Sequence, residues 1–231
     1  MTGRSVGRDD DQPSNLIRRT SMLTLVFDTE TTGKADFKFG PDHPSQPGLV
    51  QLGAILYDDR KVVAELNLIV QPRDGEGDPI PVQPEAYAKH GIDDETAARV
   101  GFFARQALDI LDGLFGKAER VVAYNARFDD LVVATECYRD DLAHIFEGCD
   151  LVCAMLSAKP VCKLPNRHGY ADYKWPSLDE AYRMLVDPNG FDNAHDAMAD
   201  VRACAAVLWA LEDGGHPLVT VESYKQGNKA T

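Results

Sequence analysis

Near the start of the chain, a short run of apolar and β-branched residues ends abruptly at a pair of acids. Residues 23–27 read LTLVF, and Asp28 and Glu30 follow directly. A run of this length and composition is typical of a buried strand rather than a helix. Side chains two residues apart in a strand point to the same face, so the two carboxylates should emerge together where the strand ends.

The rest of the chain alternates between strand-like and helix-like patterns. Strand-like runs cover residues 49–57 and 61–70, joined by a hairpin at 58–60, and then 120–124 and 148–153. Helical spacing or helix-end signals mark residues 85–90, 103–119, 129–138, 177–186 and 194–212, with polar loops at 33–48, 71–84 and 157–176. An antiparallel meander followed by helical crossovers predicts an α/β fold with a mixed β-sheet flanked by helices.

Length and composition favour one folded domain with short tails. The 231 residues fit a single domain, expected over 22–213 between flexible tails at 1–21 and 214–231. The polar N-terminal segment lacks the apolar core of a signal peptide, and no apolar run approaches the ~20 residues that span a bilayer, so we expect no membrane association. Five cysteines without a CxxC pair predict reduced thiols and a cytoplasmic location.

The net charge excludes one way of binding nucleic acid. The chain has 24 Lys and Arg against 37 Asp and Glu, a formal charge of −13. A simple basic coat that holds phosphates by net positive charge is therefore excluded. An enzyme that meets phosphates through divalent metal ions remains possible. The close pair Asp28 and Glu30 favours such an ion, because like charges repel and oxygen ligands suit Mg²⁺ or Mn²⁺. A pair of solvated acids in a turn is the alternative.

Two further acidic motifs stand at element boundaries. Asp129 follows an apolar strand where a helix begins, and could be only the N-cap of that helix. His195 and Asp200 stand at the start of the last long helix, about 140° apart around its axis. They are not stacked on one face, but both can border one cleft if His195 lies in a frayed first turn. A surface histidine beside a solvated acidic turn is the alternative.

Taken together, these motifs resemble the DEDDh family of 3′–5′ exonucleases, which includes polymerase proofreading subunits and ribonuclease T. The resemblance extends over about residues 22–213 and implies an RNase-H-like fold that releases nucleoside 5′-monophosphates from a 3′ end with two divalent ions, Mg²⁺ or Mn²⁺. By this resemblance, Asp28, Glu30 and Asp200 match the metal ligands of the family. Asp129 matches its fourth acid, and His195 matches its general base. A tyrosine-type sister group carries Tyr where this chain has Asp196, which favours the histidine type.

The resemblance also suggests residues that contact the substrate. Residues 84–92, PEAYAKHGI, are similar to a helix of the proofreading subunits whose Glu and His contact the terminal nucleotide, here Glu85 and His90. A capped helix with a chance His-Gly end is the alternative. Thr31, Thr32 and Asn125 flank the acids and are weaker candidates. Two loops, 34–39 and 163–175, mix cations with aromatics and could bind single strands, or could be ordinary packed loops.

Several functions remain open at this point. The favoured hypothesis is a metal-dependent 3′–5′ exonuclease acting on DNA 3′ ends, single-stranded or frayed, with a DNA polymerase as a possible partner. An exoribonuclease of the ribonuclease T kind is the first alternative, because the residue types do not reveal how the 2′ position fits. A non-catalytic nucleic-acid-binding module on the same fold and a phosphatase for small nucleotides are the others.

Overall fold

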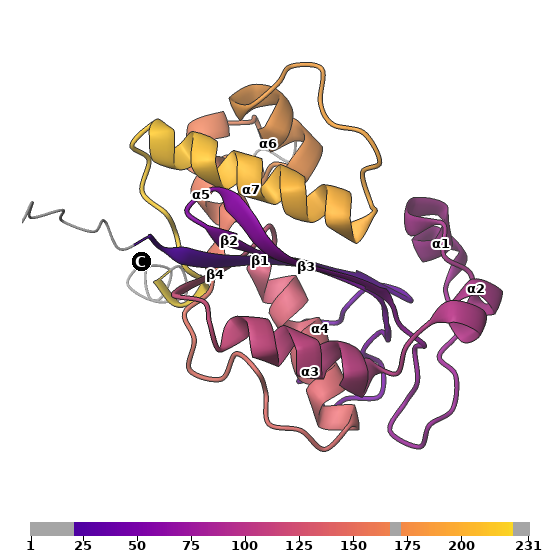
Figure 1. Ribbon diagram of the computed structural model, residues 1–231. Coiled ribbons are helices and arrows are strands. Elements are labelled where there is room, and N and C mark those ends of the chain that lie inside the picture. The colour runs from indigo at the N-terminus through magenta and orange to yellow at the C-terminus, as the bar shows by residue number, and fades with distance from the viewer. Residues whose placement is uncertain (1–20, 167–171, 224–231) are drawn as a thin grey trace, which may run out of the picture.

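The structure, a computed structural model, describes residues 21–166 and 172–223. In this part of the chain one mixed sheet has the strand order β3-β2-β1-β4-β5 (Figure 1). The strands are β1 (Leu23–Thr31), β2 (Leu49–Asp58), β3 (Lys61–Ile69), β4 (Arg120–Ala123) and β5 (Val152–Cys153). The first three pair antiparallel, whereas β4 pairs parallel to β1 and β5 parallel to β4. The predicted α/β class, with a meander followed by crossovers, is confirmed.

Helices cover both faces of this sheet (Figure 1). One face is covered by α5, α6 and α7, the opposite face by α3 and α4, while α1 and α2 lie beyond one end of the sheet. The helices are α1 (Pro84–His90), α2 (Asp94–Val100), α3 (Ala104–Phe115), α4 (Ala126–Arg139), α5 (Ala154–Cys162), α6 (Leu178–Leu185) and α7 (Ala197–Asp213). None of the described helices is long and apolar enough to cross a membrane.

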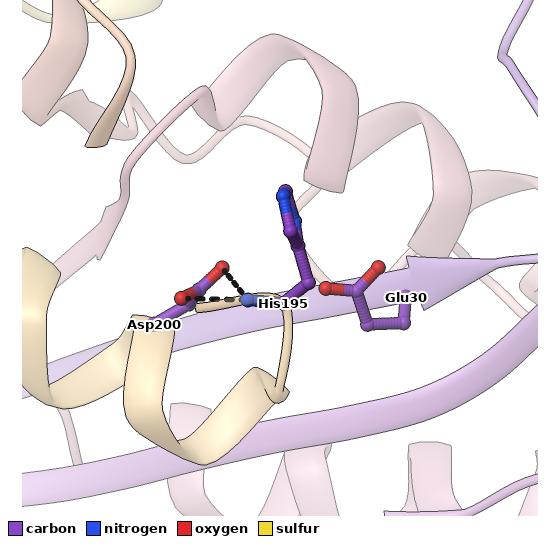
Figure 2. A group of neighbouring side chains, drawn as sticks. All are labelled: Glu30, His195 and Asp200. Atoms are coloured by element: carbon purple, nitrogen blue, oxygen red, sulfur yellow. Dashed lines mark hydrogen bonds between the residues drawn. The ribbon is translucent and has the colours of Figure 1, made fainter. Parts of the chain in front are cut away.

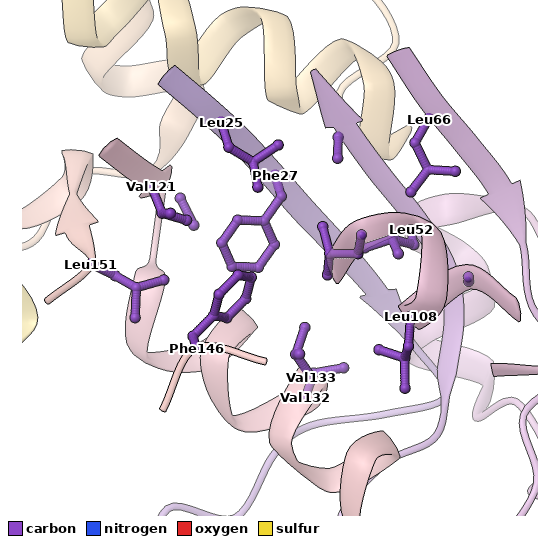
Figure 3. Close-up of a cluster of buried hydrophobic side chains, with 14 of the residues drawn as sticks. Leu25, Phe27, Leu52, Leu66, Leu108, Val121, Val132, Val133, Phe146 and Leu151 are labelled. Carbon is purple, nitrogen blue, oxygen red and sulfur yellow. The ribbon is translucent and has the colours of Figure 1, made fainter. Parts of the chain in front are cut away.

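The alternation of side chains along β1 positions the acids. Leu25 and Phe27 are fully buried against the α3 and α4 face, where Phe27 packs on Phe146 with ring centroids 4.9 Å apart (Figure 3). Val26 points the other way, into the cluster beneath α7. Burying side chains of this size stabilises the fold by ~1.5–3 kcal/mol each. Because the strand alternates, Asp28 continues the row of Val26 and faces the α7 side.

The start of α7 is fastened tightly to β2. Asp196 caps the helix by accepting from the Ala199 N–H at 3.1 Å, and the Gln51 side chain donates to Asp196 at 3.2 Å and accepts from the Ala197 N–H at 3.3 Å. Gly53 lets the two elements approach, because a Cβ there would lie 2.9 Å from the backbone of Ala197. The first turn of α7 is therefore held where β1 ends and β2 begins.

Some elements differ from those predicted. Neither α2 nor α5 was expected, and α5 occupies part of the predicted 157–176 loop although it contains Pro160. The chain leaves α5 through Lys163, which adopts a left-handed conformation with φ 49°. Helix α4 starts at Ala126, three residues before the predicted position.

The segment after α7 packs along the edge of the sheet. Cys153 donates its N–H to the Val219 carbonyl at 2.9 Å, and Val221 donates to the Leu151 carbonyl at 3.0 Å. The folded part therefore reaches beyond residue 213, where a tail was predicted to begin. The five cysteines are free thiols, four of them buried.

Candidate active site

Nine of the ten predicted site residues line one cleft of about 760 Å³ at the end of β1. They are Asp28, Glu30, Thr31, Glu85, His90, Asn125, Asp129, His195 and Asp200. Thr32 is not among the residues that line the cleft. Its buried hydroxyl instead accepts from the Gly48 N–H at 2.9 Å, so its visible role is to close the base of the 33–48 loop. Four separate parts of the chain thus meet at one point.

Asp129 is oriented by β1 and not by its own helix. It lies in the first turn of α4, after the N-cap position at Asn125, so the N-cap interpretation does not hold. One of its carboxylate oxygens accepts from both the N–H and the hydroxyl of Thr29, at 3.1 and 2.8 Å. Thr29 alternates with Asp28 and Glu30 along the strand, so the same strand supplies two acids and fixes a third.

His195 and Asp200 meet because His195 precedes the helix (Figure 2). The His195 N–H donates to both carboxylate oxygens of Asp200, each at 3.3 Å. His195 has φ 72°, a left-handed conformation that costs a non-glycine residue roughly 1 kcal/mol or more. This backbone turns the imidazole into the cleft, and ligand atoms of Glu30, His195 and Asp200 all lie within 4.8 Å of one another.

Burial raises the pKa of all four carboxylates, and neighbouring site acids add to the rise for Asp28 and Glu30. Burial and the charges of Asp129 and Asp200 raise the pKa of Asp28 well above its ordinary value. Burial, again with Asp200 and Asp129, raises the pKa of Glu30 to about 8, although Lys89 acts in the opposite direction. Burial also raises the pKa of Asp129 to about 7, against the Thr29 hydrogen bonds, and that of Asp200 to about 6.

This donor set fits divalent cations. Holding ionised carboxylates this close to one another destabilises the fold, and a bound doubly charged ion would offset that destabilisation. Carboxylate oxygens with at most one imidazole are the ligands that Mg²⁺ and Mn²⁺ take. Among the described residues, Glu30, His195 and Asp200 form a group whose ligand atoms lie close enough to share an ion, and Asp28 and Asp129 line the same cleft.

Two of the described histidines line the cleft, and both have a lowered pKa. Burial, together with Lys89, lowers the pKa of His195, so the ring is neutral at pH 7 and can take up a proton. The pKa of His90 is also lowered, chiefly by burial. Its Nε2 lies 3.2 Å from the Thr31 carbonyl and its Nδ1 accepts from the Ile92 N–H at 3.1 Å, which favours a proton on Nε2. His90 thereby ties α1 to β1.

Three supporting residues escaped the sequence analysis. Lys89 lines the cleft and lowers the pKa of both Glu30 and His195. The buried hydroxyl of Tyr124 donates toward the carbonyls that precede α6. Gln51 fixes the start of α7. Only Gln51 gave a usable signal, because it is a lone amide in an otherwise apolar strand.

The two loops of cations and aromatics differ. From the 34–39 loop, Lys34 and Phe37 line the cleft, whereas Phe39 stacks on His43 with ring centroids 3.7 Å apart. None of the described residues of the 163–175 loop lines the cleft. In that loop Lys174 forms an ion pair with Glu180 at 2.6 Å, which favours the alternative that the loop is an ordinary packed loop. Residues 167–171, with Arg167 and Tyr170, lie outside the described part.

Comparisons with known proteins agree with this geometry. An exonuclease family model, that of the RNase T group, matches residues 25–208. The DNA polymerase III subunit epsilon of Pasteurella multocida (strain Pm70) is 25% identical over 195 residues, covering 82% of this chain and 68% of that protein. The zinc-bound complex of E. coli exonuclease I with single-stranded DNA is 25% identical, with a TM-score of 0.63.

The extent of these matches limits what each one shows. The chain is matched to exonuclease I over 84% of its own length but spans only 41% of that protein. The nuclease domain of 3′hExo, a DEDDh family member bound to rAMP, has a TM-score of 0.64 over 87% of this chain and 97% of that one, but at 12% identity it supports the fold alone. Since the family model covers most of the residues, the chain belongs to the exonuclease family, and the predicted resemblance to DEDDh-type 3′–5′ exonucleases is confirmed.

Proposed function

We propose that this protein is a divalent-metal-dependent 3′–5′ exonuclease that removes nucleoside 5′-monophosphates from the 3′ ends of DNA. The observation that carries the proposal is the convergence of Asp28, Glu30, Asp129 and Asp200 with a neutral histidine in one cleft. A cluster of acids that is merely solvated would not require a histidine beside it. A binding module would have no need of a carboxylate set that is costly to keep.

The residues divide the chemistry among them. Two divalent cations, held by Asp28, Glu30 and Asp200 with Asp129 beside them, would supply positive charge to the scissile phosphate and its leaving 3′ oxygen. His195 takes the proton of the attacking water on a ring nitrogen, since its lowered pKa keeps it neutral. The water oxygen bonds to phosphorus as the bond between phosphorus and the 3′ oxygen breaks, and the 3′ oxygen takes up a proton from solvent, which leaves a nucleoside 5′-monophosphate and a strand shortened by one residue with a 3′ hydroxyl.

Other residues of the cleft would position the strand. Glu85, Asn125 and Thr31 line the cleft and offer polar atoms to the terminal nucleotide. Lys34 and Lys89 line the same cleft and offer positive charge to phosphates in a chain whose net charge is −13. His90 and Thr32 act from behind, by holding the segments that carry these residues.

DNA is the favoured substrate because both relatives at 25% identity are DNA enzymes by their names: a DNA polymerase subunit and an exonuclease in complex with single-stranded DNA. The first of them also favours a polymerase as a partner. A cytoplasmic location, suggested by the free thiols, stays part of the proposal. RNA remains the alternative substrate.

One time course tests the proposal. The protein is incubated with 5′-labelled single-stranded DNA and RNA of identical sequence, with Mg²⁺, Mn²⁺ or EDTA. We expect a metal-dependent ladder that shortens from the 3′ end, faster on DNA. A faster ladder on RNA would transfer the assignment to an exoribonuclease. No ladder on either polymer, with folded protein, would favour the binding module or a small-nucleotide phosphatase.

A variant tests the site separately from the substrate. Asp28→Ala should lose turnover together with the rise in melting temperature that Mg²⁺ gives to the unchanged protein. Full activity of Asp28→Ala would disprove the site assignment. Loss of activity with an unchanged metal response would show that the cation is held by the other acids.

A further inference from the structure

One aromatic ring at the edge of the cleft has a cation behind it. Phe37 lines the cleft and is 43% exposed, and the Cζ of Arg127 lies 4.6 Å from the centre of its ring. Arg127 comes from the first turn of α4, close to Asp129, and does not itself line the cleft. Among the described residues no carboxylate pairs with Arg127. The guanidinium therefore lies over the ring of a side chain that lines the cleft and is still 43% exposed.

The loop that carries Phe37 is built around a buried side chain. Gln46 is 2% exposed, and its amide nitrogen lies 2.9, 3.3 and 3.2 Å from the carbonyls of Asp36, Phe39 and Gly40. Its amide oxygen accepts from the Asp36 N–H at 3.2 Å. One side chain thus fastens the chain on both sides of Phe37, which sets the ring in place before any substrate binds.

The same loop is fastened to α4, the helix that supplies Arg127. Arg139 donates to the backbone carbonyls of Gln46 and Pro47, at 2.8 and 3.0 Å. The buried carboxylate of Glu136 pairs with Arg139 at 2.7 Å and accepts from the Leu49 N–H at 2.9 Å. Helix α4 therefore holds both members of the Phe37–Arg127 pair: it contains Arg127, and its Arg139 binds the loop that carries Phe37. Asp129 belongs to the same helix.

We propose that the Phe37–Arg127 pair is a stacking platform for an unpaired base of the bound strand, on the 5′ side of the nucleotide that is removed. A base stacks on the open part of the Phe37 ring, and the guanidinium behind it holds the ring and adds positive charge near the backbone. This inference rests on the proposed exonuclease function and extends it. A base that remains paired and stacked in a duplex cannot use the platform, so the platform selects single strands or frayed ends.

The experiment compares two phenylalanines of one loop. Phe37→Ala and Phe39→Ala are measured with single-stranded oligo-dT, by turnover in Mg²⁺ and by fluorescence anisotropy in Ca²⁺. Phe37→Ala should raise KM and the dissociation constant about 5- to 150-fold, the range of one lost base stack, while kcat at saturation changes far less. Phe39→Ala is the matched control, since Phe39 is equally exposed but stacks on His43 away from the cleft.

Two more variants separate stacking from simple wall packing. Phe37→Trp should restore affinity, and Phe37→Leu, which keeps an apolar wall without an aromatic face, should not. The ratio of kcat/KM for oligo-dT to that for the p-nitrophenyl ester of thymidine 5′-monophosphate, which has no second base, should fall in Phe37→Ala. Unchanged affinity in Phe37→Ala, full affinity in Phe37→Leu, or an equal loss in Phe39→Ala would overturn the platform.

The failure of the platform and the failure of the proposed function give different results. If the unchanged protein degrades oligo-dT but Phe37→Ala behaves the same, only the platform is wrong. If the unchanged protein degrades no polymer, the exonuclease proposal fails. The anisotropy measurement then still decides whether Phe37 binds a single strand.

Discussion

At the scale of single residues, the positive charge of Lys89 lowers the pKa of two groups of the cleft, Glu30 and His195. Lys89 lowers the pKa of His195, so a neutral Lys89→Met variant should have a His195 that stays protonated to higher pH. The acidic limb of its kcat/KM profile should move toward higher pH relative to the unchanged protein. Lys38→Met, which removes a lysine that does not line the cleft, is the control. An unmoved limb in Lys89→Met would remove Lys89 from this role.

His195 could serve either as the general base or as a metal ligand, and one variant distinguishes these roles. If it is the base, His195→Ala should lower kcat by ~10²–10⁴-fold while Mg²⁺ still raises the melting temperature. If it is a ligand, since its ring lies within 4.8 Å of the Glu30 and Asp200 ligand atoms, both responses should weaken. Metal titration followed by thermal unfolding, alongside single-turnover rates, separates the two. Unchanged turnover would exclude both roles.

The sequence predicted the acids and the histidine that meet in the cleft better than the residues around them. Asp28 and Glu30 alone are an ordinary acid pair, and they became readable because two further motifs, at Asp129 and at His195 and Asp200, accompany them. Lys89 was not readable, since a lysine near a helix end is ordinary and only the fold turns it toward Glu30. Phe37 was readable as one of several loop aromatics, but its separation from Phe39 depends on how Gln46 ties the loop.

At the scale of elements, the site depends on how closely α7 approaches β2. Gly53→Ala would place a Cβ 2.9 Å from the Ala197 backbone, so the first turn of α7 must shift. The shift should destabilise the fold by ~1–3 kcal/mol and, because it moves Asp200 and His195, lower kcat by up to ~10²-fold. Chemical unfolding and turnover on oligo-dT measure the two effects.

Gly113 supplies the opposite case. It lies inside α3 with no atom within 4 Å of an added Cβ, so Gly113→Ala should stabilise the fold by roughly 0.5–1 kcal/mol and leave turnover unchanged. A Gly53→Ala variant as stable and active as this one would show that α7 tolerates displacement, and that its packing on β2 does not position the site.

The missed helices show where sequence patterns stop being informative. Asp93 caps α2 by accepting from the Thr96 N–H at 2.8 Å, a local signal that was present in the sequence. The helix α5 was hidden by Pro160, which usually marks a break, yet the helix continues for two residues beyond it. Tertiary packing decides for α5, which buries Ala154 and Ala158 beneath α7, whereas α2 was missed although its cap is local.

At the scale of the whole molecule, the acidic site couples stability to pH and to metal. In the folded chain the pKa values of Glu30, Asp129 and Asp200 lie at about 8, 7 and 6, above those of the unfolded chain. The metal-free fold therefore binds more protons than the unfolded chain between about pH 4 and 8. The contribution of these three carboxyl groups to the free energy of unfolding is fully present below about pH 4 and is lost as pH rises through their pKa values in the folded chain.

The melting temperature should follow from this. In EDTA it should fall by several degrees between about pH 5 and pH 8, and Mg²⁺ should restore it, with a larger effect at pH 8 because the ion binds ionised carboxylates. Asp129→Asn should flatten both responses. Glu136→Gln is the matched control, since burial raises the pKa of Glu136 to about 7 away from the cleft, and it should change only the response without metal. An equal effect of Mg²⁺ at pH 5 and pH 8 would contradict a carboxylate-held ion, and would leave the raised pKa values as a cost of burial alone.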